Sequence, residues 1–263
     1  MMSFYKSAAA GAVLLSCLLL TACQPADNSG SSVVSETSVS SETESSSQAE
    51  ATPTPTPAAT PEVSSESQEE SSSQGSTDNA CFENSAFVGN SMLEDLNMFG
   101  IIDNADFYAK TGLTVSSVFT DKTVDGSAPI MDEVTSKKYD KVFLMFGLNE
   151  LGWSYSSVFT QDYGKIIDTL RESNPEVEIY VQSLFPVSKK RSGQNLYGVT
   201  NERIVEYNDM LKELCTEKDV HYVDVYSSMV TEDGALADGA SPDGVHPNME
   251  YCETWVQYLR DHC

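Results

Sequence analysis

Two kinds of hydrophobic pattern alternate along residues 81–263. Short apolar runs, rich in β-branched and aromatic residues, predict five strands at Ser85–Gly89, Asp106–Lys110, Lys141–Phe146, Val177–Ser183 and Val220–Val225. Segments with a helical repeat lie between these runs. Because strands that alternate with helices are typical of parallel sheets with right-handed crossovers, we expect an α/β fold, a three-layer α/β/α sandwich around a mainly parallel, five-stranded sheet.

The helical repeat is clearest in two segments. One apolar stripe runs from Tyr163 to Leu170, with Thr160 as the expected N-cap and Asn174-Pro175 as the expected stop. A second stripe runs from Ile204 to Leu214. Each stripe predicts a helix that packs one face against the sheet.

The first 80 residues show no such alternation. Residues 1–22 combine one lysine with an apolar run too short to span a membrane, which predicts an export signal. Residues 20–23, "LTAC", resemble the lipobox of bacterial lipoproteins, which implies cleavage before Cys23 and lipid modification of Cys23; the alternative is an ordinary secretory signal. Residues 23–80 are rich in Ser, Thr, Glu and Pro, and predict a disordered tether.

This organisation predicts where the protein resides. Residues 81–263 are long enough for one domain with a full core. We expect that domain on the extracytoplasmic side of a bacterial cell membrane, attached to the membrane only through the lipid on Cys23.

The charge of the domain makes nucleic acid an unsuitable partner. The chain has 40 acidic and 15 basic residues; ten of the acids lie in residues 24–80 and one lysine lies in the signal, which leaves 30 acidic and 14 basic residues, a net charge of about −16. A field of this sign repels nucleic acid at long range. The basic run Lys189–Arg191 is a local exception, and such a run is typical of a solvated face.

Four cysteines remain for the domain once the signal with Cys17 is removed and Cys23 is lipid-modified: Cys81, Cys215, Cys252 and Cys263. Three pairings are possible, and export permits disulfides. On a continuous C-terminal helix Cys252 and Cys263 would lie about 16 Å apart, beyond the roughly 7 Å limit for a disulfide, so Cys81–Cys263 is favoured. None of the four has paired ligand spacing, and we expect no metal and no cofactor.

Polar residues follow several predicted strands at the rim where open parallel sheets bind ligands. Ser91 follows the first strand, Gly112 the second and Asn149 the third, while Asp243 and His246 come well after the fifth. Each has a simpler structural explanation, since Ser91 could cap a helix and the others could be turn residues. Together they supply the groups of a nucleophilic site.

A serine nucleophile needs a base, an orienting partner for the base and donors for a developing oxyanion. His262 is the penultimate residue and His221 begins a strand at the opposite end of the sheet, which leaves His246 as the base. Asp243 lies three residues before His246 and can accept a hydrogen bond from its ring. The oxyanion donors would be the backbone N–H groups of Ser91 and Gly112 and the amide of Asn149.

The ordered set of motifs resembles the SGNH, or GDSL-like, hydrolase family over residues 82–263. Its four blocks correspond here to "VGNSM", "KTGLT", "FGLNELG" and "DGVHPN". The resemblance implies that Ser91 is the nucleophile, His246 the base and Asp243 its partner, with an oxyanion hole from Ser91, Gly112 and Asn149. The sequence departs from the family pattern at Asn90 and Glu150, where the family usually has aspartate.

The resemblance implies a serine esterase that hydrolyses small acyl esters through an acyl-enzyme. Export favours O-acetyl esters on carbohydrate or cell-envelope substrates. Trp153 and Tyr155 could stack on a sugar ring, or could pack against their own domain. Two alternatives stay open: an O-acyltransferase with the same site, and a surface binding module that keeps the fold without turnover.

Overall fold

The computed structural model describes residues 79–263. The predicted signal peptide, the lipid-modified Cys23 and residues 23–78 of the predicted tether lie outside the described residues. The predicted domain begins at Cys81, and Asn79, two residues earlier, already packs against it. Asn79 is only 4% exposed, and its side chain accepts hydrogen bonds from Arg260 and donates one to the carbonyl of Ile101, so these contacts hold it in the fold.

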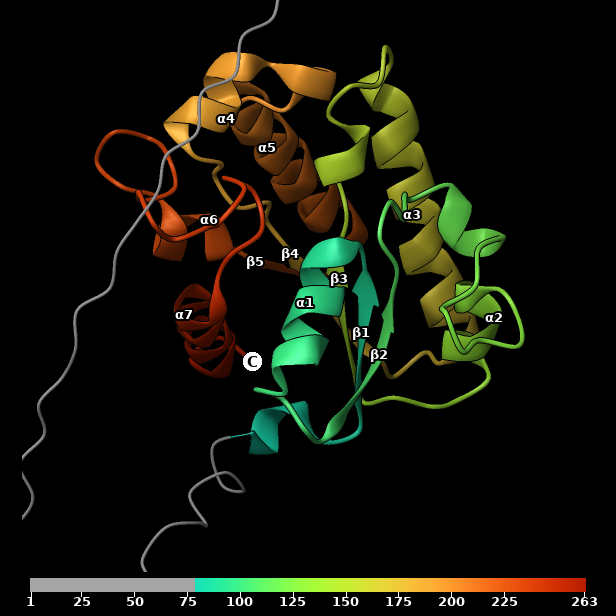
Figure 1. The fold of residues 1–263 in the computed structure, drawn as a ribbon. Coiled ribbons are helices and arrows are strands. Elements are labelled where there is room, and N and C mark those ends of the chain that lie inside the picture. Colours follow the sequence, from blue (N-terminus) through green and yellow to red (C-terminus); the bar gives the residue numbers. More distant parts are fainter. Residues whose placement is uncertain (1–78) are drawn as a thin grey trace, which may run out of the picture. The chain divides into compact units, whose positions relative to one another are not determined.

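A five-stranded parallel sheet forms the centre of the domain, as the hydrophobic pattern predicts (Figure 1). Its strands, each within two residues of the predicted bounds, are β1 (Ser85–Gly89), β2 (Ala105–Ala109), β3 (Lys141–Met145), β4 (Glu178–Gln182) and β5 (His221–Val223). They lie in the order β2-β1-β3-β4-β5. The strand order therefore reverses between β1 and β3, because the chain adds β2 on one side of β1 and the later strands on the other. Open α/β sheets bind ligands at such a reversal.

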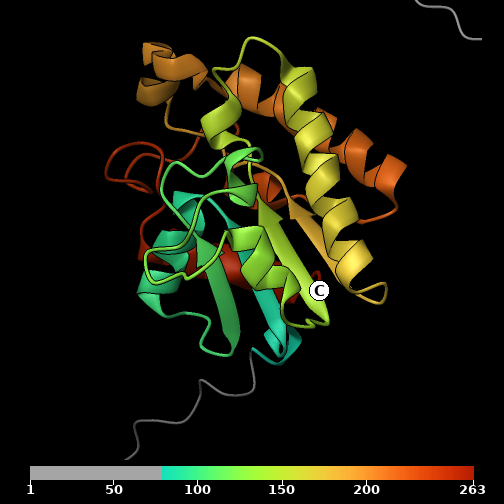
Figure 2. The same cartoon turned by 90° about the vertical axis from the view of Figure 1, so that its right-hand side faces the viewer.

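Helices cover both faces of the sheet and complete the predicted three-layer sandwich (Figures 1 and 2). One face carries α1 (Ser91–Phe99), α6 (Val225–Met229) and α7 (Met249–Arg260), and the other carries α2 (Ile130–Thr135), α3 (Ser156–Ser173) and α5 (Asn201–Lys218). Shorter elements are α4 (Lys189–Gln194) and the 3-10 turns η1 (Ala80–Phe82), η2 (Ser117–Phe119), η3 (Leu148–Glu150) and η4 (Leu196–Gly198). Among the described residues, no helix combines the length and the apolar character needed to cross a membrane.

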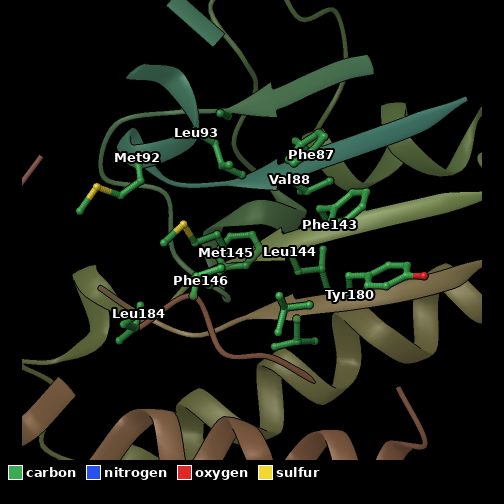
Figure 3. Close-up of a cluster of buried hydrophobic side chains, with 14 of the residues drawn as sticks. Phe87, Val88, Met92, Leu93, Phe143, Leu144, Met145, Phe146, Tyr180 and Leu184 are labelled. Carbon is green, nitrogen blue, oxygen red and sulfur yellow. The ribbon is translucent and has the colours of Figure 1, made fainter. Parts of the chain in front are cut away.

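A row of stacked aromatic rings crosses the sheet and fixes its register. The rings of Phe107, Phe87, Phe143, Tyr180 and His221 come from β2, β1, β3, β4 and β5, with successive centroids 5.0, 4.6, 4.9 and 4.6 Å apart. Figure 3 shows Phe87, Phe143 and Tyr180 within this row. Because each ring pairs with a neighbour at the same level, the row aligns the carboxyl ends of the strands, where the candidate site residues lie.

The prediction that Thr160 caps a helix is wrong. Helix α3 begins a turn earlier, at Ser156, and Thr160 lies inside it with its hydroxyl donating to the Ser157 carbonyl. The reason is tertiary: Phe159 is fully buried against Tyr163, which extends the apolar stripe toward the N-terminus. The predicted stop at Asn174 is confirmed, since Asn174 is the C-cap.

A disulfide joins Cys81 to Cys263, whose Cα atoms are 6.2 Å apart. The bond links the two ends of the domain across a sequence separation of 182 residues, and closing so long a loop restricts the unfolded chain strongly. Cys215 and Cys252 are buried thiols, and burial raises the pKa of each to about 12. Neither thiol is therefore activated as a nucleophile.

Candidate active site

Ser91 is the first residue of α1, and the residue that caps this helix is Asn90. The side chain of Asn90 accepts a hydrogen bond from the Met92 N–H at 3.1 Å. Because the cap is already supplied, the Ser91 hydroxyl is not needed to satisfy the helix end. It points instead to a residue 155 positions away in the sequence.

That residue is His246, which lies in the loop before α7. Its Nε2 is 2.9 Å from Ser91 Oγ, and its Nδ1 is 2.7 Å from Asp243 Oδ2. An ionised carboxylate only accepts hydrogen bonds, so Nδ1–H donates to Asp243 and the lone pair of Nε2 faces the serine hydroxyl. The sequence-predicted trio is thus assembled in a line that can carry a proton from Ser91 to His246.

Asp243 is held in its ionised form. Burial acts to raise its pKa, but hydrogen bonds from the His246 ring, from the N–H groups of His246 and Val245 and from the Ser241 hydroxyl outweigh burial and hold that pKa well below its usual range. Three of these donors bind Oδ1, which leaves Oδ2 to the imidazole. Asp243 can therefore fix the orientation of His246 at any pH near neutrality.

The residues that carry the three predicted oxyanion donors line the same cavity. The N–H groups of Ser91 and Gly112 have no hydrogen-bond acceptor within residues 79–263, and Gly112 has a positive φ of 77° that presents bare backbone to the cavity. The side-chain amide of Asn149 donates one bond, at 2.9 Å, to the Leu113 carbonyl and keeps a second N–H. These groups can stabilise negative charge on a carbonyl oxygen.

Glu150 links the two loops that carry Gly112 and Asn149 through hydrogen bonds. Its carboxylate is fully buried and accepts hydrogen bonds from Val115 N–H at 2.8 Å and from Gly147 N–H at 3.1 Å. The first bond crosses to the loop of Gly112, and so does the bond from Asn149 to the Leu113 carbonyl. Burial raises the pKa of Glu150 to about 7, against the lowering effect of those backbone donors. The longer side chain that replaces the usual aspartate thus spans the gap between the loops.

A cavity of about 720 Å³ opens over the serine, within the size range of small-molecule sites. All five predicted residues of the catalytic trio and the oxyanion hole line it: Ser91, Gly112, Asn149, Asp243 and His246. The remaining lining residues are Asp95, Thr111, Leu148, Arg191, Gln194, Tyr197, Val199 and Val245.

The expectation that Trp153 and Tyr155 lie at the site must be corrected. Neither lines this cavity: Trp153 packs against the hydrophobic core, and Tyr155 is 74% exposed at the start of α3. The aromatic side chain at the cavity is Tyr197, which is 86% exposed and has a positive φ. No local signal marks Tyr197, because the fold of its loop decides which aromatic side chain reaches the rim.

Two charged residues of the cavity were also missed. Asp95 lies four residues after Ser91, so helical periodicity alone places both on one face of α1. Burial raises the pKa of Asp95, against the lowering effect of His246. Arg191 belongs to the basic run that was expected to be a solvated face, but its side chain is half-buried and lines the cavity.

No group of three or more His, Cys, Asp or Glu side chains within residues 79–263 is arranged to hold a metal ion. A hydroxyl, an imidazole, an orienting carboxylate and converging N–H donors are the groups needed for acyl transfer.

One protein-family model matches most of the chain. The model of the GDSL-like lipase/acylhydrolase family matches residues 73–251. No curated protein sequence is similar enough to count as a match.

Solved structures of low sequence identity share the fold. A protein from Streptococcus pneumonia, named as a candidate platelet activating factor, is 21% identical with a TM-score of 0.56, over 68% of this chain and 83% of that one. A GDSL-like lipase from Bacteroides thetaiotaomicron is 15% identical with a TM-score of 0.52, over 70% and 93%. A carbohydrate esterase of family 3 from Talaromyces cellulolyticus is 16% identical with a TM-score of 0.50, over 68% and 95%.

Proposed function

The chain belongs to the GDSL-like lipase/acylhydrolase family, and from that premise we propose that it is a serine esterase that forms an acyl-enzyme on Ser91. The observation that carries the proposal is the continuous contact from Ser91 Oγ through the His246 ring to Asp243, with distances of 2.9 and 2.7 Å. Such a line activates a hydroxyl that is otherwise a weak nucleophile.

In the first half of the reaction, Ser91 Oγ attacks the carbonyl carbon of the ester while its proton moves to His246 Nε2. Negative charge develops on the carbonyl oxygen, where the N–H groups of Ser91, Gly112 and Asn149 can donate to it. The C–O bond to the alcohol then breaks, and the alcohol leaves with the proton from His246. The acyl group remains on Ser91.

In the second half, His246 takes a proton from water and the resulting hydroxide equivalent attacks the acyl carbon. The same donors hold the oxyanion, and the proton on His246 returns to Ser91 Oγ as the acid departs. Asp243 stays ionised throughout, because its hydrogen bonds keep its pKa low. It orients the imidazole and stabilises the imidazolium that forms in each half.

We propose small acyl esters, above all O-acetyl esters of carbohydrates, as the substrates. Polar side chains that can bind sugar hydroxyls line the cavity, including Asp95, Thr111 and Gln194, and Tyr197 supplies an aromatic face on which a sugar ring can stack. One structure of the same fold is a carbohydrate esterase. At 16% identity that likeness establishes the fold only, so the substrate class rests on the lining residues.

The test compares the full chain with its Ser91→Ala variant. We expect the wild type to release acetate from acetylated sugars and to be labelled on Ser91 by a fluorophosphonate, because both reactions require an activated serine. We expect the variant to do neither. Equal acetate release by both proteins would reject the mechanism. Transfer of the acetyl group to an added sugar in preference to water would instead identify an acyltransferase.

We further propose that the domain is anchored to the outer face of a bacterial membrane through Cys23. This proposal rests on the sequence of residues 1–23, which lie outside the described residues. It predicts that cells fed a labelled fatty acid attach the label to the wild-type protein and not to a Cys23→Ser variant. Equal labelling of both would remove the anchor from the proposal.

A further inference from the structure

One arginine differs from the other three in the domain. The guanidinium groups of the other three all donate hydrogen bonds within the domain. Arg171 donates to the carbonyls of Lys218 and Asp219, and Arg203 donates to the carbonyls of Leu151 and Trp153. Arg260 donates to the side chain of Asn79. The guanidinium of Arg191 has no hydrogen bond and no ion pair with any described residue.

Arg191 is nevertheless not a loosely placed surface residue. The carbonyl of Gly244 accepts a hydrogen bond at 2.8 Å from Ser188 N–H, which docks the start of α4 on the loop between Asp243 and His246. The approach is close: a Cβ added to Gly244 would lie 2.3 Å from Ser188 Oγ and 3.2 Å from Arg191 Cβ. The backbone of the catalytic loop therefore sets the position from which the Arg191 side chain enters the cavity.

The cavity has a distinctive charge distribution. Arg191 is the only cationic side chain among the residues that line it, apart from any charge on His246, and the carboxylates that line it are Asp95 and Asp243. Asp243 is already occupied by four hydrogen-bond donors. In a domain where acidic residues outnumber basic ones by about two to one, an arginine without a carboxylate partner at a cavity has its donors available to a ligand.

The ligand group would lie on the side away from the oxyanion donors. A second cavity of about 310 Å³ shares Arg191, Gln194 and Asp243 with the first and contains neither Gly112 nor Asn149. The second cavity also has Lys190 and Asp238 in its lining. An ester with its carbonyl at the oxyanion donors has room for its alcohol portion along the shared edge, and in that pose Arg191 would face the alcohol portion.

From these observations we infer that the enzyme selects acyl esters of sugars that carry a carboxylate, and that Arg191 binds that carboxylate. The inference rests on the proposed esterase function and specifies its substrate class. A planar guanidinium presents parallel N–H donors that match the two oxygens of a carboxylate, and such charge-assisted pairs are strong and directional. Arg191 would therefore determine specificity without taking part in bond making.

The experiment uses a pair of O-acetylated methyl glycosides that differ only in the charged group. One is the glycoside of glucuronic acid with a free carboxylate, called the glucuronide below, and the other is the corresponding glucoside. We expect wild-type kcat/KM to be about 10-fold or more higher for the glucuronide, mostly through KM, because the pairing is made in the ground state as well as the transition state. Arg191→Gln should bring the ratio of the two kcat/KM values close to one, and Arg191→Lys should retain part of the preference.

Lys189→Gln is the matched control, since it removes the same charge from the same helix at a side chain that is exposed and lines neither cavity. It should keep the wild-type ratio. An equal ratio in wild type and Arg191→Gln would overturn the inference, and so would loss of the preference in Lys189→Gln, which would assign it to overall charge. If the enzyme preferred an acetylated glucose 6-phosphate to the acetylated glucuronide, the inference of a carboxylate ligand would be rejected in favour of a phosphate.

A binding measurement separates this inference from the proposed function. Calorimetric titration of the Ser91→Ala variant with the acetylated glucuronide requires no turnover. We expect binding that weakens about 10-fold or more when Arg191→Gln is added and that also weakens with salt. If wild type fails to release acetate but this difference in binding persists, only the esterase mechanism fails. If Ser91→Ala and the double variant with Arg191→Gln bind the acetylated glucuronide equally, the role of Arg191 is rejected.

Discussion

Two carboxylates serve the same site from opposite environments. Asp243 has a side chain that is 51% exposed, it receives four hydrogen bonds, and its pKa lies well below the usual range. Glu150 is fully buried with two backbone donors at its oxygens, and burial raises its pKa to about 7. The carboxylate of Asp243 is thus kept charged near neutral pH, whereas the pKa of Glu150 lies close to neutral pH.

These different environments indicate separate roles for the two carboxylates. Asp243 acts on a side chain, because it accepts a hydrogen bond from the His246 ring, which in the proposed mechanism receives the serine proton. Glu150 acts on the backbone, because it holds the loops of Gly112 and Asn149 at a fixed separation. Loss of Asp243 should therefore disturb proton transfer, while loss of Glu150 should disturb stability and the geometry of the oxyanion hole.

The largest effect is expected for Asp243→Asn. The amide would place an N–H₂ group opposite Nδ1, which favours the tautomer with its proton on Nε2 and removes the base from Ser91. We expect kcat to fall on the order of 10³- to 10⁴-fold. Steady-state kinetics on an aryl acetate measure this, with circular dichroism as the check on folding. A loss of less than about 10-fold, with the fold intact, would show that His246 is oriented without Asp243.

The pH dependence of stability should sharpen the contrast. The pKa of Glu150 is about 7 in the folded protein and 4.5 for an ordinary glutamate, so the folded state retains this proton to a higher pH than the unfolded state. Its contribution to the free energy of unfolding therefore falls as pH rises from about 4.5 to about 7, by about 3 kcal/mol in total. Asp243 has a lowered pKa, and its contribution is lost only as pH falls below the ordinary range of aspartate.

Urea denaturation at several pH values between 5 and 7.5 measures this slope. The wild type should lose more free energy of unfolding across this range than Glu150→Gln, which has no proton to release there. Exposed carboxylates contribute equally to both proteins, so the difference between the two slopes isolates Glu150. Parallel slopes would mean that Glu150 is already ionised in the folded protein at pH 5.

A smaller effect is expected for Glu150→Gln on activity and stability near neutral pH. The amide N–H₂ would face one of the two backbone N–H donors, so one hydrogen bond is lost and a buried donor is left without a partner. We expect a loss of about 1–3 kcal/mol in the free energy of unfolding and about 10-fold in kcat. Thermal melts and kinetics measure both quantities.

Glu172→Gln is the control for that variant, because Glu172 is exposed on α3 and makes no side-chain hydrogen bond with a described residue. It should change neither quantity. A Glu150→Gln enzyme with full kcat despite a lower melting temperature would leave Glu150 a purely structural residue, with no effect on the oxyanion donors.

Much of the fold and of the catalytic line could be predicted from the sequence. The apolar runs locate every strand, because a buried parallel strand needs continuous hydrophobic side chains. The residues after those strands meet at one rim because the strands are parallel. The start of α3 could not be predicted, since the burial of Phe159 against Tyr163 outweighs the capping tendency of Thr160.

The same distinction applies within the site. Ser91, His246 and Asp243 carry their chemistry in their residue types, and few alternatives exist in a domain with three histidines. Arg191 and Tyr197 carry no such signal, because a basic run and a loop tyrosine are common on any surface. Arg191 reaches the cavity because α4 docks against the loop of Gly244, and Tyr197 reaches it from a loop whose backbone packs closely against Gly152.

The α/β architecture, the order of the motifs and the candidate reacting groups could be inferred from the sequence alone, because hydrophobic periodicity and side-chain chemistry are local properties. The burial of Glu150, the exposure of Asp243 and the position of Arg191 follow from tertiary packing. Burial and pairing depend on residues that are far apart in the chain and become neighbours only when the sheet and its helices have packed.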